Sequence, residues 1–158
     1  MNYPFVFFDT VDKIHSGTIP AQMVGIERWV CDPTYGMRCY VPVYNGTGGT
    51  LAANAPVRWK SGELTGEIVA ASQDEPVASA AGLLETALTN LYWGWACRKG
   101  VHPYTADEAI DADDLLMAGV TAGSMYDPAV AGLEHCIWGR AIDACNDTET
   151  GYMRLCLP

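Results

Sequence analysis

Hydrophobic and polar positions alternate over short stretches in much of the chain, and this predicts strands separated by turns. Residues 23–31 and 37–44 are rich in β-branched and aromatic side chains and alternate imperfectly, as half-buried strands do. The sequence Asp-Pro-Thr-Tyr-Gly at residues 32–36 lies between them and is a turn signal, so the two runs predict a hairpin. Pro42 lacks an N–H group, which predicts that the second strand is an edge strand or carries a bulge.

The same reading extends to the C-terminus. Further strands are predicted at residues 57–59, 67–71, 92–99, 136–145 and 152–157. The last two form a hairpin that ends the chain, and in residues 92–99 the side chains of Trp93, Trp95 and Cys97 share one face. Many short strands with frequent turns predict an all-β fold, either a β-barrel or a β-sandwich with a C-terminal hairpin.

One segment has a helical pattern instead. Residues 75–91 are rich in Ala, Leu and Glu, and Pro76 suits a first helical turn. An apolar stripe at helical spacing includes Ala80, Leu84 and Leu88. The segment predicts a helix of one to three turns, so that the fold has at most one or two short helices.

Length and composition suggest a single β-rich domain over residues 1–158, in which residues 1–9 form either an N-terminal arm or a first strand. The net charge of -10 disfavours nucleic acid and anionic membranes as partners. No apolar run approaches the roughly 18 residues of a transmembrane helix. The N-terminus lacks a secretory signal, so we expect a protein made in a cytosol, with its six cysteines as thiols buried in the core.

Candidate chemistry is sparse. His135 and Cys136 are neighbours, and neighbours on a strand point to opposite faces, so they do not readily ligate one ion. The acidic residues 107–114 lack the central Gly and closing Glu of a calcium loop, which favours a solvated turn. No nucleophile elbow is present. We therefore expect no catalytic residues, no metal, no cofactor and no enzymatic activity.

The aromatic residues are the strongest candidates for contact with a partner. The chain has five tryptophans, whose ordinary role is core packing and whose alternatives are a protein interface or a sugar-stacking surface. Trp93 and Trp95 are candidate interface residues on this basis. Phe5, Phe7 and Phe8 are the others, because an apolar terminal segment either forms a first strand or docks on a neighbouring subunit.

Four segments resemble strands of tailed-phage structural proteins. Residues 92–101 are similar to their Tyr-Gly-Trp-Val strand, and residues 138–144 to their Ile-Gly-Arg-Ala-Leu-Glu-Ala strand. Residues 151–157 match the closing Gly-x-x-x-Val-x-Leu strand, and residues 109–116 resemble a turn segment in which Asp113 replaces the usual Gly. The resemblance covers about half of the chain and is to the capsid decoration, or cement, proteins of tailed phages.

The resemblance implies a β-barrel or β-sandwich cement protein on the capsid surface of a virion. Such a bacteriophage protein binds the outside of the major capsid protein lattice and stabilises it, often as a homo-oligomer, with a trimer favoured. Assembly would take place in the bacterial host cytoplasm. Two alternatives stay open, namely another virion component of the tail or neck and a carbohydrate-binding β-sandwich module.

Overall fold

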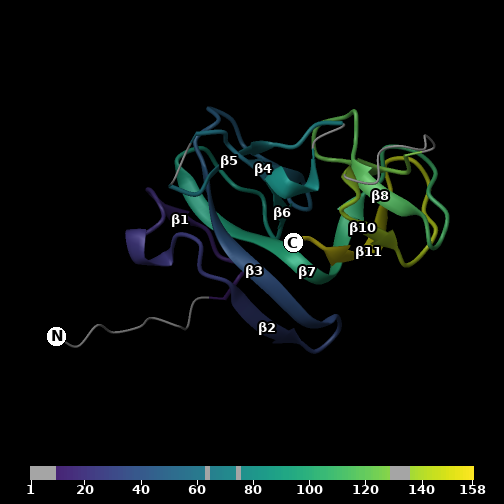
Figure 1. Cartoon of the computed structure of the whole chain (residues 1–158), viewed down its shortest axis with the longest axis horizontal. Coiled ribbons are helices and arrows are strands. Elements are labelled where there is room, and N and C mark those ends of the chain that lie inside the picture. The colour runs from purple at the N-terminus through teal and green to yellow at the C-terminus, as the bar shows by residue number, and fades with distance from the viewer. Residues whose placement is uncertain (1–9, 63–64, 74–75, 129–135) are drawn as a thin grey trace.

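The chain folds into one large β-sheet with almost no helix (Figure 1). The computed structural model describes residues 10–62, 65–73, 76–128 and 136–158. Its strands are β1 (His15–Ser16), β2 (Arg28–Asp32), β3 (Gly36–Asn45), β4 (Pro56–Trp59), β5 (Glu67–Ala70), β6 (Ala80–Leu84), β7 (Tyr92–Thr105), β8 (Leu115–Ala118), β9 (Met125–Tyr126), β10 (Gly139–Ala141) and β11 (Thr150–Cys156). Two single 3-10 turns, η1 (Ala21–Met23) and η2 (Val77–Ser79), are its helical elements. The predicted all-β fold is confirmed.

Five strands close into a barrel. β3 pairs with β5, β5 with β4, β4 with β6, β6 with β7, and β7 returns to β3. The barrel interior is filled by small aliphatic side chains, as a narrow barrel requires. Its buried residues are Val41, Val43, Ala55, Val57, Ile68, Ala81, Leu84, Leu88 and Ala96.

The long strand β7 leaves the barrel and continues into an open part of the same sheet, which we call the second sheet. Its C-terminal half pairs with β11 from Lys99 to Thr105, and the sheet continues through β10 and β8 to β9. Figure 1 shows this green and yellow part beside the barrel. A second core with larger side chains packs here and against the outside of the barrel, and it includes Tyr104, Met117, Met125, Trp138 and Met153.

Both predicted hairpins are confirmed, although the first strand of each is shorter than expected. β2 pairs with β3 in antiparallel register, and β10 pairs with β11 in the same way. β2 begins only at Arg28, because residues 21–23 form the turn η1. The strand predicted at residues 136–145 is reduced to β10.

Pro42 lies where β3 changes neighbours. Along one edge β3 pairs with β7 throughout residues 39–45. Along the other edge it pairs with β2 as far as Tyr40 and with β5 from Tyr44. Pro42 falls in the gap between these two partners, where a missing N–H group leaves no ladder bond unmade. The predicted bulge is present nearby, as a register shift between Cys39 and Tyr40.

The helix predicted at residues 75–91 is wrong. Apart from η2, the apolar part of this segment is strand β6, which pairs with β4 and β7. Ala80 and Leu83 point into the second core, whereas Ala81 and Leu84 point into the barrel. A strand that is buried on both faces is apolar at every position, so its residues also fit a helical stripe. No helix in the described part of the chain is long and apolar enough to cross a membrane.

Candidate partner-binding surface

The predicted interface tryptophans lie inside the protein. Trp93 is 7% exposed and Trp95 is 4% exposed. Their rings meet edge to face with 6.2 Å between centroids, and His15 of β1 stacks on Trp93 at 4.4 Å. They share one face of β7 with Cys97, as the alternation predicted, and that face belongs to the second core. Phe5, Phe7 and Phe8 lie outside the described residues.

Another tryptophan lies at the surface. Trp29 of β2 and Met37 of β3 are each 53% exposed, and Cys31 is exposed beside them. Cys31 is the cross-strand partner of Met37, and paired residues point to the same side of a sheet. We call Trp29, Cys31 and Met37 the hairpin outer face. The alternation in residues 23–31, which places Trp29 and Cys31 opposite Val30, was the signal that could have identified it.

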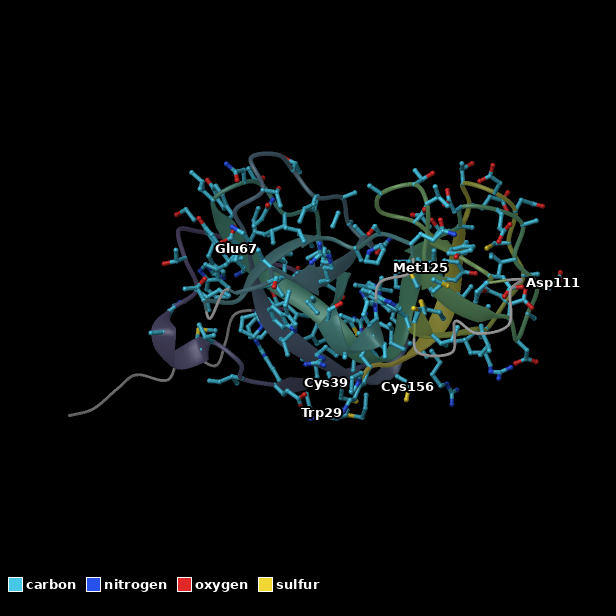
Figure 2. The ribbon with its side chains drawn as sticks, turned by 45° about the horizontal axis from the view of Figure 1, so that its top comes forward. Trp29, Cys39, Glu67, Asp111, Met125 and Cys156 are labelled. Carbon is cyan, nitrogen blue, oxygen red and sulfur yellow. The ribbon has the colours of Figure 1, made fainter. Side chains whose placement is uncertain are left out.

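The outer face continues across the sheet as a row of paired residues. Trp29 pairs with Cys39, Cys39 with Lys99, and Lys99 with Cys156. Figure 2 shows Trp29, Cys39 and Cys156 together on one side of the molecule. Cys156 is exposed, while Cys39 is buried, and burial raises the pKa of its thiol. The row therefore connects the exposed Trp29 to the exposed Cys156 through the buried Cys39 and the half-buried, charged Lys99.

The sequence predicted that all six cysteines lie in the core, and this prediction is wrong for two of them. Cys39, Cys97 and Cys136 are buried, but Cys31 and Cys156 are exposed. The reason is the strand period, because Cys31 and Cys156 occupy outward positions of β2 and β11.

β2 is also an edge of the sheet. Within the described residues it pairs with β3 alone and stands at the end of the strand order. An edge strand presents unpaired backbone N–H and C=O groups that can pair with another chain. An exposed tryptophan on such a strand adds an apolar anchor, so β2 and the hairpin outer face are the strongest candidate surface for a partner.

A buried cluster of polar side chains fixes this hairpin to the barrel. Arg38 of β3 is 4% exposed. Its guanidinium lies 2.8 Å from a carboxylate oxygen of Asp32 and 3.3 Å from one of Glu85. The ion pairs join β2 and β3 to the segment after β6. A buried guanidinium needs such partners to offset its desolvation, so the hairpin is held in one position.

Glu85 is the centre of the cluster. Its Oε2 atom accepts a hydrogen bond from the Tyr40 hydroxyl at 2.9 Å and lies 3.1 Å from Nε2 of His102. Burial alone would raise the pKa of Glu85, but the hydrogen bond and charge of His102 and the charge of Arg38 outweigh it, and the pKa is lowered. Burial chiefly raises the pKa of the nearby Cys97 thiol to about 12, so this thiol is not the thiolate that a nucleophile requires at neutral pH.

The tip of the hairpin is fixed as well. One Asp32 carboxylate oxygen accepts hydrogen bonds from the backbone N–H groups of Thr34 and Tyr35, at 2.8 and 2.9 Å. The Tyr35 ring then contacts Tyr152 of β11, with centroids 5.5 Å apart and a 3.3 Å bond between the hydroxyls. These contacts hold the hairpin outer face rigid before any partner binds, which lowers the entropy cost of binding.

Most of the excess negative charge lies in one part of the chain, which does not include the hairpin outer face. Residues 105–150 contain ten acidic residues and one basic residue, Arg140, whereas residues 1–104 contain nine acidic and seven basic residues. We call residues 105–150 the acidic lobe. Figure 2 places Asp111 of this lobe at one end of the molecule, away from Trp29.

His135 with Cys136, and the acidic residues 107–114, were weighed as metal sites from the sequence, and both were disfavoured. Among the described residues, no group of three or more His, Cys, Asp or Glu side chains is placed to hold a metal ion. His135 lies outside the described residues. In the acidic segment, Asp107 instead accepts a hydrogen bond from the backbone of Thr121 at 2.9 Å, and the Asp114 carboxylate accepts one from the N–H of Asp111 at 2.8 Å.

The fold and this surface together define an all-β protein with a narrow closed barrel, a second open sheet and a rigid, exposed edge hairpin. No protein-family model matches the chain, and no curated protein matches it in sequence. Its fold is similar to that of the N base of the head fiber protein gp8.5 of bacteriophage phi29, with a TM-score of 0.58 and 11% sequence identity. The match covers 76% of this chain and 95% of that chain. At this identity the likeness shows a shared fold.

Proposed function

We propose that the protein is a structural component of a tailed-phage virion that decorates the head. The observation that carries the proposal is the fold, which is similar to nearly the whole length, 95%, of a phage head fiber base. The resemblance of residues 83–158 to capsid decoration proteins supports the same assignment from the sequence. In the finer form of the proposal, the protein binds the outer surface of the major capsid protein lattice and stabilises it.

The surface chemistry suits a partner that is bound rather than transformed. The hairpin outer face offers a tryptophan and a methionine, each 53% exposed, on a hairpin that is already fixed. A standard interface of about 1,600 Å² is within reach of a chain of 17.0 kDa. Repetition of the contact over a capsid adds avidity. The proposed role therefore requires neither catalysis nor a cofactor, and its partners are the major capsid protein and further copies of the chain.

A second candidate is a fiber base, which would attach at few positions of the head instead of covering the lattice. The structural neighbour is itself the base of a head fiber, which favours this candidate specifically. The two candidates differ in the number of copies per virion, because a lattice-binding protein repeats with the capsid subunits.

Quantitative mass spectrometry of purified virions separates these candidates. For a decoration protein we expect hundreds of copies per particle, in fixed ratio to the major capsid protein. A few tens of copies would support the fiber base. Absence from purified particles, or enrichment in separated tails, would contradict a head protein of either kind.

Binding can be measured directly on capsids that lack the protein. The purified chain should bind them saturably and raise the temperature at which they break open. Trp29→Lys should weaken this binding, because it places a charge in the apolar contact. Val120→Lys is the matched control, since Val120 is 71% exposed in the acidic lobe and the change has the same chemistry.

A further inference from the structure

The sequence of the edge strand β2 is complementary to itself. Its residues are Arg28, Trp29, Val30, Cys31 and Asp32. Two such strands placed antiparallel about a two-fold axis at Val30 bring Arg28 of each copy opposite Asp32 of the other. Trp29 of each copy then lies opposite Cys31 of the other. Opposite charges in cross-strand positions stabilise a pair of strands, and an isologous two-fold contact needs such a self-complementary patch.

We propose that a second copy of the chain pairs with this one along β2, so that the two sheets join into one across a two-fold axis. The inference extends the self-association in the proposed function, and it can be tested on the purified chain alone. Main-chain hydrogen bonds would satisfy the edge of β2, as in other cases of strand addition. The charge pattern selects the antiparallel register centred on Val30.

The side chains on both faces of β2 suit this pairing. Trp29 and Cys31 point outward, beside Met37, so the outer faces of the two copies would form one apolar strip across the axis. On the other face, Asp32 remains 20% exposed while it binds Arg38, and its charge can therefore act on the second copy without the loss of that bond. Arg28 lies on this same face, where its guanidinium stands over the Trp95 ring at 5.6 Å.

The distribution of charge also permits the contact. With a net charge of -10, two copies repel one another over most orientations. Residues 1–104 contribute little to this repulsion, since they carry nine acidic and seven basic residues. Pairing through β2 leaves the acidic lobes away from the axis (Figure 2). The isologous contact further differs from the trimer favoured by the resemblance, because a ring of three needs a heterologous contact.

Sedimentation of the purified full chain over a concentration series tests the proposal. We expect a reversible dimer of two 17.0 kDa chains. Trp29→Lys should raise the dissociation constant at least tenfold, because it places two cations in the apolar strip. Val120→Lys should leave it unchanged, with folding of both variants checked by circular dichroism. A monomer at all concentrations, a trimer, or an equal effect of both variants would overturn the proposal.

The register can be tested by cross-linking. In Trp29→Cys, the introduced thiol should form a disulfide with Cys31 of the second copy when oxidised glutathione takes up the two electrons. Trp29→Cys combined with Cys31→Ser should not form this cross-link. Disulfides that join other positions, or none in the single variant, would contradict pairing about Val30. The cross-linking experiment contains no capsid, so the absence of a dimer would not contradict the proposed function at the phage head. In the same way, a failure to bind capsids would not contradict the dimer.

Discussion

The barrel and the second sheet share strand β7 but differ in their cores. The barrel encloses Val, Ala, Leu and Ile side chains, whereas the core of the second sheet holds Trp138, Tyr104 and several methionines. In a closed five-stranded barrel the strands leave little room, so small side chains and close backbone contacts are required. The open sheet has no such limit, and its core depends on a few large side chains. The second core should therefore be destabilised most by the loss of a large side chain, and the barrel most by added atoms where its backbones are close.

They also differ in charge. The acidic lobe carries ten acidic residues against one basic residue, while residues 1–104 are nearly balanced. Like charges close together destabilise a folded region and raise the cost of ionising each carboxyl group. Burial is the main cause of the raised pKa of Asp127, and the negative charge of Asp114 raises this pKa further. The barrel contributes a rigid frame, and the lobe contributes solubility at some cost in stability.

The largest expected effect is the loss of a large side chain from the second core. Trp138 is 1% exposed, and Trp138→Ala should lower the free energy of unfolding by about 3–5 kcal/mol. Ile68→Val in the barrel interior should cost only about 0.5–1.5 kcal/mol. Urea unfolding measures both. Since β7 belongs to both regions, each variant should shift one common transition; two separate transitions would show that the regions unfold independently.

The barrel should be most sensitive where its backbones are closest. Gly82 of β6 has φ +145°, and a Cβ added there would clash with the carbonyl oxygen of Cys97. Gly82→Ala should therefore cost about 3 kcal/mol through clash and backbone strain together. Gly48→Ala is the control, because Gly48 has φ +88° with nothing near its added Cβ, and should cost about 1 kcal/mol. Equal losses on urea unfolding would refute the close contact between β6 and β7.

A smaller loss is expected from the polar cluster that holds the hairpin. Glu85→Gln should cost about 2 kcal/mol, since it removes a charge that is hydrogen-bonded to several partners. Lys60→Met should cost less than about 1 kcal/mol, because the Lys60–Glu67 ion pair is partly exposed.

The same cluster predicts a pH dependence. The pKa of Glu85 is lower in the folded state than its ordinary value of 4.5, so its contribution to stability is complete above that value and is lost as the pH falls through the folded pKa. Acid unfolding of Glu85→Gln should therefore have a shallower slope below about pH 4.5. An unchanged slope would mean that other carboxylates control acid unfolding.

The smallest effect is a gain in the acidic lobe. The folded pKa of Asp127 is raised, so its ionised form is disfavoured in the folded state once the pH exceeds the ordinary value of 3.8. Asp127→Asn should raise the free energy of unfolding at pH 7 by roughly a few tenths of a kcal/mol after solvent screening, and the thermal midpoint should rise slightly with it. The part of the gain that comes from repulsion by Asp114 should shrink in about 1 M salt, where repulsion is screened, whereas the larger part that comes from burial should remain. Asp147→Asn, in an exposed turn, is the control and should change the stability less. A loss of stability in Asp127→Asn would contradict the unfavourable ionisation of Asp127 in the folded state.

The sequence by itself determined the features that depend on local pattern. Alternation and turn residues predicted the all-β class, both hairpins and the shared face of Trp93, Trp95 and Cys97. Pro42 also predicted an irregularity in β3, which is present as the register shift between Cys39 and Tyr40. These signals are local because strand period and turn geometry depend on neighbouring residues.

Only the tertiary structure decided which strands are enclosed on both sides and which surface is left open. Residues 80–84 have a helical composition, yet pairing with β4 and β7 makes them a strand, because long-range contacts outweigh the small differences in local propensity. Trp95 and Trp29 are both tryptophans in strands, and Trp95, but not Trp29, was named from the sequence as a candidate interface residue. Trp95 is buried and Trp29 exposed because β7 crosses the middle of the sheet while β2 lies at its edge, and strand order is set by contacts between residues far apart in the chain.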